Sequence, residues 1–284
     1  ALATDLASEK TRHQVVTMLY LMLLVGMVIG ALGFSLLLEP FSYFRLIQVI
    51  QGSALVVAAL NLIAMWQMEP RRPDLTDFNI ARPTFIESWK ALSTSAGAHR
   101  LLIAVALGTL GFSMQEMLLE PYGAEVLGMT VSQTTRLTAM FGVGMLLAMA
   151  LSARYLGNAG EPIRLAAYGA VVGVFAFAAV IIAGATESLG LFAAGTFLIG
   201  VGNGLFAVGT LTAAMLLASN ATAGIVIGTW GAVQATAAGI AVFMGGALRD
   251  ITEALILRAG VTTDLFGSAT PYGAVYHLEI IILF

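Results

Sequence analysis

The chain has no cysteine and very few charged residues. Without cysteine there can be no disulfide bond, no thiolate ligand for a metal ion and no cysteine nucleophile. Only 10% of the 284 residues are charged, whereas soluble domains carry about a quarter. The formal charge of −3 gives no basis for binding nucleic acid. These shortages exclude most classes of soluble protein and indicate a surface that lies largely in lipid.

What the chain has in abundance is long apolar runs. Hydrophobic residues make up 59% of the sequence, and the mean hydropathy is +0.92. Each complete run reaches the ~20 residues that a helix needs to cross a bilayer, and the runs lack the alternation of barrel strands. All seven prolines lie at or beyond the ends of these runs, where helices stop. The predicted spans are residues 14–38, 46–68, 101–121, 137–157, 164–184, 189–217, 224–248 and an incomplete run from 273.

The sequence therefore predicts an all-α polytopic membrane protein with seven whole spans and one partial span. It opens on Ala1–Asp5 without a basic stretch, and it stops inside the apolar run 279–284. We expect from these two ends that the chain is the ordered part of a longer protein.

Basic residues in the connections are divided unevenly between the two sides of the membrane. Loops richer in Lys and Arg stay in the cytoplasm, so the side with nine such residues is the predicted inner side. That side holds Lys10, Arg12, Arg71, Arg72, Arg82, Lys90, Arg100, Arg154 and Arg164, and the outer side holds Arg45, Arg136, Arg249 and Arg258. In the long inner connection 69–100, apolar residues recur at helical spacing from Phe85 to Leu92, which predicts a short helix on the membrane surface.

A short motif occurs twice, at an interval of 211 residues. Leu6-Ala7-Ser8 with Thr11 precedes one span, and Leu217-Ala218-Ser219 with Thr222 precedes another. The two spans are six spans apart and run in the same direction. Parallel repeats of six spans are the architecture of major facilitator transporters.

This interpretation predicts that about eight of twelve helices of the major facilitator fold are present. The predicted parts are residues 1–68, the fifth and sixth helices of the N-terminal half; residues 69–100, the cytoplasmic linker with its surface helix; and residues 101–284, the C-terminal half with its last helix incomplete.

Polar side chains are scarce within the spans and gather in the outer half of the predicted bilayer. Such groups are costly in lipid and usually face the interior of the bundle. They are Gln115, Glu116 and Glu120 at the end of span 101–121, His277 and Glu279 in the last span, and Gln48 and Gln51 in span 46–68. The functional hypothesis is a ligand or proton site. The alternative is that the carboxylates cap helix ends and face water.

Small residues mark two further segments. Gly195, Gly200, Gly202, Gly204 and Gly209 lack the strand and lysine of a phosphate-binding loop, so we expect close helix packing. The segment 228–234 is interpreted as the same packing device. Within it Trp230 and Gln234 share one helix face, which suits an aromatic ligand, although core packing explains them better.

Three stretches together resemble the bacteriochlorophyll delivery family, the PucC-like and LhaA-like members of the major facilitator superfamily. They are Ala3-Thr4-Asp5-Leu6-Ala7 with the helix after it, Gln115-Glu116-Met117-Leu118-Leu119-Glu120-Pro121-Tyr122-Gly123, and Gly228-Thr229-Trp230-Gly231-Ala232-Val233-Gln234. The resemblance covers essentially the whole chain. The inner segment 154–158, Arg-Tyr-Leu-Gly-Asn, departs from the motif of sugar and drug transporters because it lacks the expected aspartate.

The resemblance implies a cargo and a location. Bacteriochlorophyll would be bound between helices and passed to antenna polypeptides, in the inner or intracytoplasmic photosynthetic membrane. The implied partners are membrane lipids, light-harvesting antenna polypeptides, the reaction-centre complex and a second copy of the chain, and they include no nucleic acid. The pigment's magnesium takes one axial ligand, which His277 or Glu116 could supply; the protein needs no metal of its own.

Two other functions fit the same sequence. The six-span repeat and Glu116 suit a proton-coupled transporter of a small solute. The second is a structural subunit that holds antenna helices in place without binding pigment. An enzyme is not expected, because no catalytic constellation satisfies the geometric requirements for nucleophile, base and orienting group.

Overall fold

The computed structural model describes residues 12–39, 41–66, 86, 96–217, 223–258 and 269–284, and in these ranges the regular structure is entirely helical. The helices are α2 (Arg12–Leu37), α3 (Tyr43–Met65), α5 (Ala96–Ser113), α6 (Leu119–Glu125), α7 (Val131–Gly157), α8 (Pro162–Ala185), α9 (Leu189–Leu217), α10 (Ala223–Arg258) and α12 (Thr270–Leu283).

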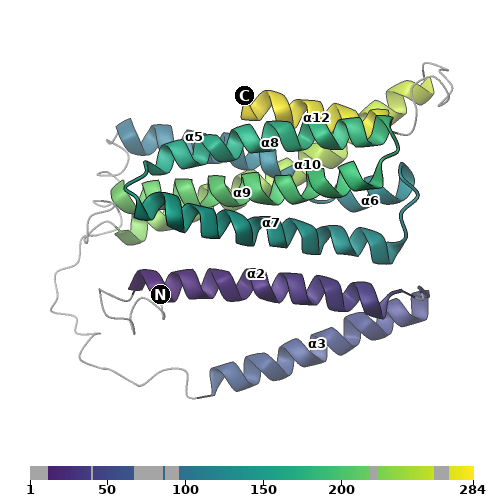
Figure 1. Ribbon diagram of the computed structural model, residues 1–284, viewed down its shortest axis with the longest axis horizontal. Coiled ribbons are helices and arrows are strands. Elements are labelled where there is room, and N and C mark those ends of the chain that lie inside the picture. Colours follow the sequence, from purple (N-terminus) through teal and green to yellow (C-terminus); the bar gives the residue numbers. More distant parts are fainter. Residues whose placement is uncertain (1–11, 40, 67–85, 87–95, 218–222, 259–268) are drawn as a thin grey trace.

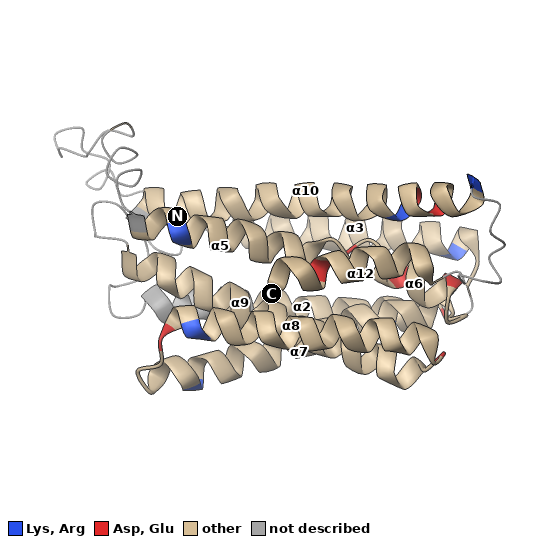
Figure 2. Cartoon of the chain, turned by 90° about the horizontal axis from the view of Figure 1, so that it is seen from above, with Lys and Arg blue, Asp and Glu red and all other residues tan. Residues whose placement is uncertain are grey.

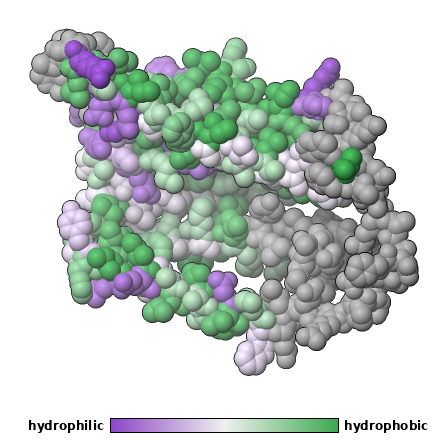
Figure 3. All heavy atoms as spheres, turned by 180° about the vertical axis from the view of Figure 1, so that it is seen from behind, coloured by the Kyte–Doolittle hydropathy of each residue, from purple (hydrophilic) through white to green (hydrophobic). Residues whose placement is uncertain are grey.

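The long helices run side by side along the length of the molecule (Figure 1). Five of them, α3, α7, α8, α9 and α10, are long and apolar enough to cross a membrane, and α2 and α5 contain shorter apolar stretches. Apolar side chains cover much of the face seen in Figure 3, while charged residues concentrate toward the helix ends in Figure 2. The chain is therefore a multi-pass membrane protein, as the sequence predicts.

Two predicted spans have the wrong boundaries. The span expected over 101–121 is a helix only to Ser113, and the chain then turns before α6 begins at Leu119. Pro121 explains the break, because a proline ring would collide with the carbonyl of residue 117 in a continuous helix. The span expected over 224–248 continues to Arg258, which makes α10 longer than the bilayer requires.

Helix α9 is the centre of the C-terminal group, because it packs against both α7 and α8, and α5 packs against α10 and α12. On the other side of α7 lies α2, and α3 lies beyond it in Figure 1. Helix α3 has no buried residue among those described. The predicted surface helix falls outside the described residues apart from Ile86, and the repeated motif does so apart from Leu217.

The glycines of α9 confirm the prediction of close helix packing. A side chain at Gly200 would collide with the backbone carbonyl of Phe141 in α7. One at Gly202 would lie 2.8 Å from the carbonyl oxygen of Gly169 in α8. Backbones approach this closely only where neither helix carries a side chain at the crossing. In α10, by contrast, a Cβ at Gly228 or Gly231 would meet no described atom within 4 Å, so these two glycines do not make the predicted close packing within the described part of the chain.

The contact between α2 and α7 includes a polar cluster near one end. The Ser35 hydroxyl donates to the carbonyl oxygen of Ser132 at 2.9 Å, and the Arg136 Nε donates to the Ser35 hydroxyl at 3.0 Å. This end also carries Arg249 and Arg258, and we call it the outer end. The opposite end, where α5, α8 and α10 begin, we call the inner end; which end faces the cytoplasm stays a prediction.

Candidate functional site

The turn between α5 and α6 is the centre of the predicted polar site. Gln115 lies in this turn and is buried. Its backbone carbonyl accepts hydrogen bonds from the amides of Leu118 and Leu119, both at 2.9 Å. Its own amide donates to Oε1 of Glu279 in α12 at 2.8 Å. A backbone amide that loses its helical acceptor at a break needs another acceptor in lipid. The Glu279 carboxyl is that acceptor for the Gln115 amide.

Glu279 is fully buried, and it retains unused hydrogen-bonding capacity. Among the described residues its Oε2 has no hydrogen-bond partner, and neither has Oε1 of Gln115. No salt bridge to Glu279 occurs in the described ranges. An unpaired carboxylate is very costly inside a bilayer. We therefore expect Glu279 to be an uncharged acid that accepts with one oxygen and can donate with the other.

The other predicted polar residues lie at the surface of the described bundle. Glu116 is exposed and accepts a hydrogen bond from the Ser113 hydroxyl at 3.1 Å. Glu120 is exposed and accepts from the Thr138 hydroxyl at 2.8 Å. Gln48 and Gln51, on α3, are exposed and do not join the cluster. The structure thus brings together Gln115, Glu116 and Glu279 rather than polar groups from three spans.

His277 is exposed on α12, and one of its ring nitrogens forms a hydrogen bond. Its Nδ1 lies 2.6 Å from the carbonyl oxygen of Gly273. A carbonyl can only accept, so Nδ1 donates the proton of this hydrogen bond, and in the neutral tautomer that satisfies it the lone pair is on Nε2. This arrangement suits a metal ligand, as the sequence hypothesis requires.

Trp230 lies in the core, and Gln234 lies apart from both grooves described below. The Trp230 ring is 6% exposed and packs with Val105 of α5 and Ala214 of α9. Gln234 is half-buried. Neither residue lines these two grooves. The Trp230 ring packs in the core, but its indole Nε1 is buried without a hydrogen-bond partner among the described residues, so a ligand at Trp230 stays a prediction.

A groove of about 840 Å³ runs between α5 and α10 in the inner half of the molecule. Its eleven lining residues are glycine, alanine, threonine or branched aliphatic residues, and none is charged. They are Ala106, Leu110, Gly224, Ile225, Gly228, Thr229, Ala232, Val233, Thr236, Ala237 and Ile240. The sequence interpretation missed this groove, although small residues spaced three and four apart from Gly224 onward mark its floor.

A second groove, of about 770 Å³, lies between α5 and α8 near the inner end. Its lining includes Arg100 and Glu161. It continues the space that α12 occupies, because Leu283 of α12 packs against Gly111 of α5 and Gly173 of α8. Since the groove is an extension of this helix-packing site, we assign no ligand to it.

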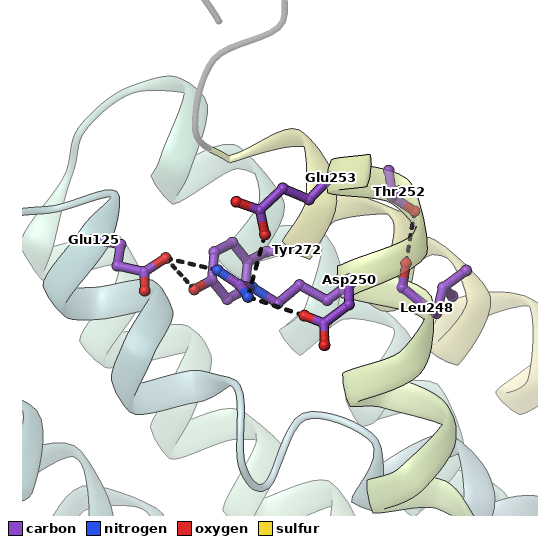
Figure 4. A network of polar contacts seen from close by, with 7 residues as sticks. Glu125, Leu248, Asp250, Thr252, Glu253 and Tyr272 are labelled. Carbon is purple, nitrogen blue, oxygen red and sulfur yellow. Dashed lines mark hydrogen bonds and ion pairs between the residues drawn. The ribbon is translucent and has the colours of Figure 1, made fainter. Parts of the chain in front are cut away.

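A charged network closes the outer end (Figure 4). Arg249 of α10 contacts Glu125 at 3.1 Å, Asp250 at 3.0 Å and Glu253 at 3.3 Å. The Tyr272 hydroxyl donates to Glu125 at 2.5 Å, and the Arg249 guanidinium lies 5.0 Å from the centre of the Tyr272 ring. The network joins α10, α6 and α12; the Arg249–Glu253 pair has the i,i+4 spacing of a helix ion pair, whereas the contacts with Glu125 and Tyr272 are not local in sequence.

The whole chain, residues 1–284, matches the family model described as PUCC protein. The chain belongs to this family. It is 45% identical to Protein PucC of Cereibacter sphaeroides, with 100% of this chain and 61% of that protein covered. It is 46% identical to the uncharacterized protein in the puhA-bchM intergenic region of Rhodobacter capsulatus, covering 100% of this chain and 60% of the relative.

A more distant relative is the bacteriochlorophyll synthase 44.5 kDa chain of Rhodobacter capsulatus. The two are 27% identical over 94% of this chain and 63% of that protein. The chain thus spans about three fifths of the length of these curated relatives.

The fold is similar to the crystal structure of a bacterial homolog to the human lysosomal transporter Spinster, in an inward-facing and unoccupied conformation. The TM-score is 0.67 at 16% identity, and the match covers 99% of this chain and 70% of the other. At this identity the likeness shows the fold alone. It confirms the predicted major facilitator fold; the proposed division into domains stays a prediction.

Proposed function

We propose that the protein binds bacteriochlorophyll between its helices and delivers it to light-harvesting antenna polypeptides in the photosynthetic membrane. The observation that carries this proposal is the match of the entire chain to the PUCC family. A relative that is named as a chain of bacteriochlorophyll synthase supports the same cargo. The reaction-centre complex and membrane lipids are the further proposed partners.

The chemistry of the bundle suits an apolar cargo better than a small polar solute. A solute transporter would need polar groups facing its pathway. The α5–α10 groove has no charged lining residue. Delivery of a pigment requires binding and release of the cargo but no catalysed reaction, so the proposal does not require an enzyme.

His277 is the residue that we propose as the axial ligand of the pigment's magnesium. Because Nδ1 donates to the carbonyl of Gly273, the neutral tautomer of the ring presents the lone pair of Nε2 to a metal. An exposed, uncharged histidine on a membrane helix is costly unless something coordinates it or bonds to it. Glu116, the other sequence candidate, is bonded to Ser113 and would bring a charge, so His277 fits better.

The test is purification of the complete gene product in mild detergent with bacteriochlorophyll a, followed by an absorption spectrum. We expect pigment to co-purify, and His277→Leu to shift the spectrum and lower occupancy at least tenfold. Ile281→Leu, on the same exposed face of α12, is the matched control and should retain the pigment. Absence of pigment from the wild type, together with normal antenna levels after gene deletion, would exclude the proposed function.

The proton-coupled transporter remains the second candidate, because Glu279 is a buried acid with an unused oxygen. Flux of a solute in proteoliposomes that stops in Glu279→Gln and follows an imposed proton gradient would favour it. Glu116→Gln makes the same test for the residue that the sequence singles out.

A further inference from the structure

Three buried polar side chains lie where α12 packs against the break between α5 and α6. Gln115, Tyr276 and Glu279 are each at most 2% exposed. The Gln115 amide donates to Oε1 of Glu279 at 2.8 Å, so these two residues are in direct contact. Tyr276 precedes Glu279 by three residues, which places both side chains on one face of α12. The Tyr276 phenol and the Glu279 carboxyl are also close enough to interact electrostatically.

Each of the three side chains has one oxygen atom without a hydrogen-bond partner among the described residues. The three atoms are Oε1 of Gln115, the hydroxyl of Tyr276 and Oε2 of Glu279. Buried polar groups of folded proteins are nearly always hydrogen-bonded, and inside a bilayer there is no bulk water to complete them. Three such atoms on two segments in contact therefore indicate one partner that they share.

The groups next to these atoms are aromatic or already have a partner of their own. The Tyr276 ring lies 5.6 Å from the Tyr122 ring and 6.1 Å from the Phe177 ring, between centroids. The Tyr122 hydroxyl donates to the carbonyl of Val180 at 3.4 Å. Glu116, whose carboxylate interacts electrostatically with that of Glu279, accepts from the Ser113 hydroxyl. The shared partner is therefore a small molecule rather than another described side chain.

We propose that the three oxygen atoms bind one ordered water molecule. A buried water typically makes about three hydrogen bonds to groups that lack other partners. The uncharged acid of Glu279 donates to the water from Oε2, and the water donates to Oε1 of Gln115. The Tyr276 hydroxyl, which can donate or accept, makes the third bond.

A divalent cation fits this set of oxygen atoms less well than water does. Calcium and magnesium take about six or more oxygen ligands, and the cluster offers three. In the described ranges there is also no group of three or more His, Cys, Asp or Glu side chains that could hold a metal ion.

The water joins α12 to the helix break on the buried face of α12, whereas His277 lies on the exposed face. Bonds from Tyr276 and Glu279 to the same water fix the rotation of α12 about its axis, and with it the direction in which His277 points. This inference goes beyond pigment delivery and holds whether or not the protein binds pigment.

Two tyrosines provide a matched test. Tyr276→Phe and Tyr122→Phe each remove one hydroxyl and keep a ring in the same aromatic pair. Among the described residues the Tyr276 hydroxyl lacks a partner, while the Tyr122 hydroxyl has one. Each variant is combined with Gln115→Met in the complete gene product, and melting temperatures are measured in mild detergent.

The expected result is a difference in additivity between the two pairs. Gln115→Met and Tyr276→Phe remove bonds to the same water, so the double variant should lose less than the sum of the two single shifts, by about 2 °C or more. The shifts of Gln115→Met and Tyr122→Phe should add. A structure of the complete protein that resolves solvent should show a peak within about 3.2 Å of all three oxygen atoms.

Two results would overturn the proposal. Additive shifts in both pairs, or a solvent-resolving structure without this peak, would show that the three atoms share no water. Sodium chloride and choline chloride at equal ionic strength should give the same melting temperature. A rise specific to sodium that Glu279→Gln abolishes would assign the site to a cation instead of water.

Discussion

Glycine serves opposite purposes in α9 and in the first half of α10. At Gly200 a methyl group would strike the backbone of α7, so the glycine permits two helices to touch. At Gly228 a methyl group would meet nothing within 4 Å, so the glycine leaves an open space. The comparison teaches that the same small-residue pattern can line a packed interface or an open groove. Only the neighbouring helix decides which.

The largest effect is expected for Gly200→Leu in the packed region. The side chain would collide with the Phe141 carbonyl, and backbone cannot move aside as a flexible side chain can. Overpacking costs typically ~1–3 kcal/mol and more where nothing can relax, so we expect the protein to lose its folded peak in detergent gel filtration. Gly190→Leu in the same helix, with nothing within 4 Å, should elute as the wild type does; equal behaviour of the two variants would contradict the packing argument.

The next effect should come from Glu279→Ala, which removes the acceptor for the amide of Gln115. Leaving a buried donor unsatisfied costs about 1–3 kcal/mol, and we expect a clear fall in melting temperature. Glu279→Gln keeps an acceptor oxygen without charge and should remain within about 1 kcal/mol of the wild type. A glutamine variant as unstable as the alanine variant would show that the carboxyl is ionised after all.

A smaller effect is expected for Arg249→Ala at the outer end of α10. The Arg249 side chain is 23% exposed and contacts acids that are about half exposed or more, and such ion pairs contribute about 1 kcal/mol at most. The loss should shrink as salt is added, because screening weakens exposed pairs. Arg164→Ala, whose pair with Glu161 is largely exposed, should change the melting temperature less; a reversed order would be evidence against the network.

The smallest effect belongs to Gly228→Ala in the groove. With no atom near the added methyl group, the substitution should leave stability unchanged or raise it by up to ~1 kcal/mol through helix propensity. Thermal unfolding in detergent measures this. Destabilisation comparable to that of Gly200→Leu would mean that another part of the protein fills the groove.

The spans and the fold class could be predicted from the sequence because lipid imposes a simple rule on length and polarity. The packing of Gly200 and Gly202 was predictable for a similar reason. The break after Ser113 was not predicted, although Pro121 signals it, because an apolar run through 119 looks like a continuous span. The pairing of Gln115 with Glu279 spans 164 residues, and no local spacing reveals such a contact.

The candidate site was only partly predictable. Gln115, Glu116 and Glu279 lie together as the sequence suggested, but exposure of Gln48 and Gln51 depends on where α3 packs, which periodicity does not determine. The α5–α10 groove depends on the space between two helices whose contact is not local. His277 was identified by its residue type, while the hydrogen bond from its Nδ1 to the carbonyl of Gly273 is a contact that the sequence does not show.

Helix α10 has 36 residues, which makes it about 54 Å long, well beyond a hydrocarbon layer of ~30 Å. It bears on the α5–α6 turn near Gly245, where an added side chain would strike the Met114 carbonyl. The α5–α10 groove, with Thr229 in its lining, lies on the inner side of that point. Arg249 and the carboxylates that it contacts lie on the outer side. Helix α10 is held on both sides of that point, because Val226 and Trp230 of its inner part are buried with residues of α5 and α9 and Arg249 is bound by acids at its outer end.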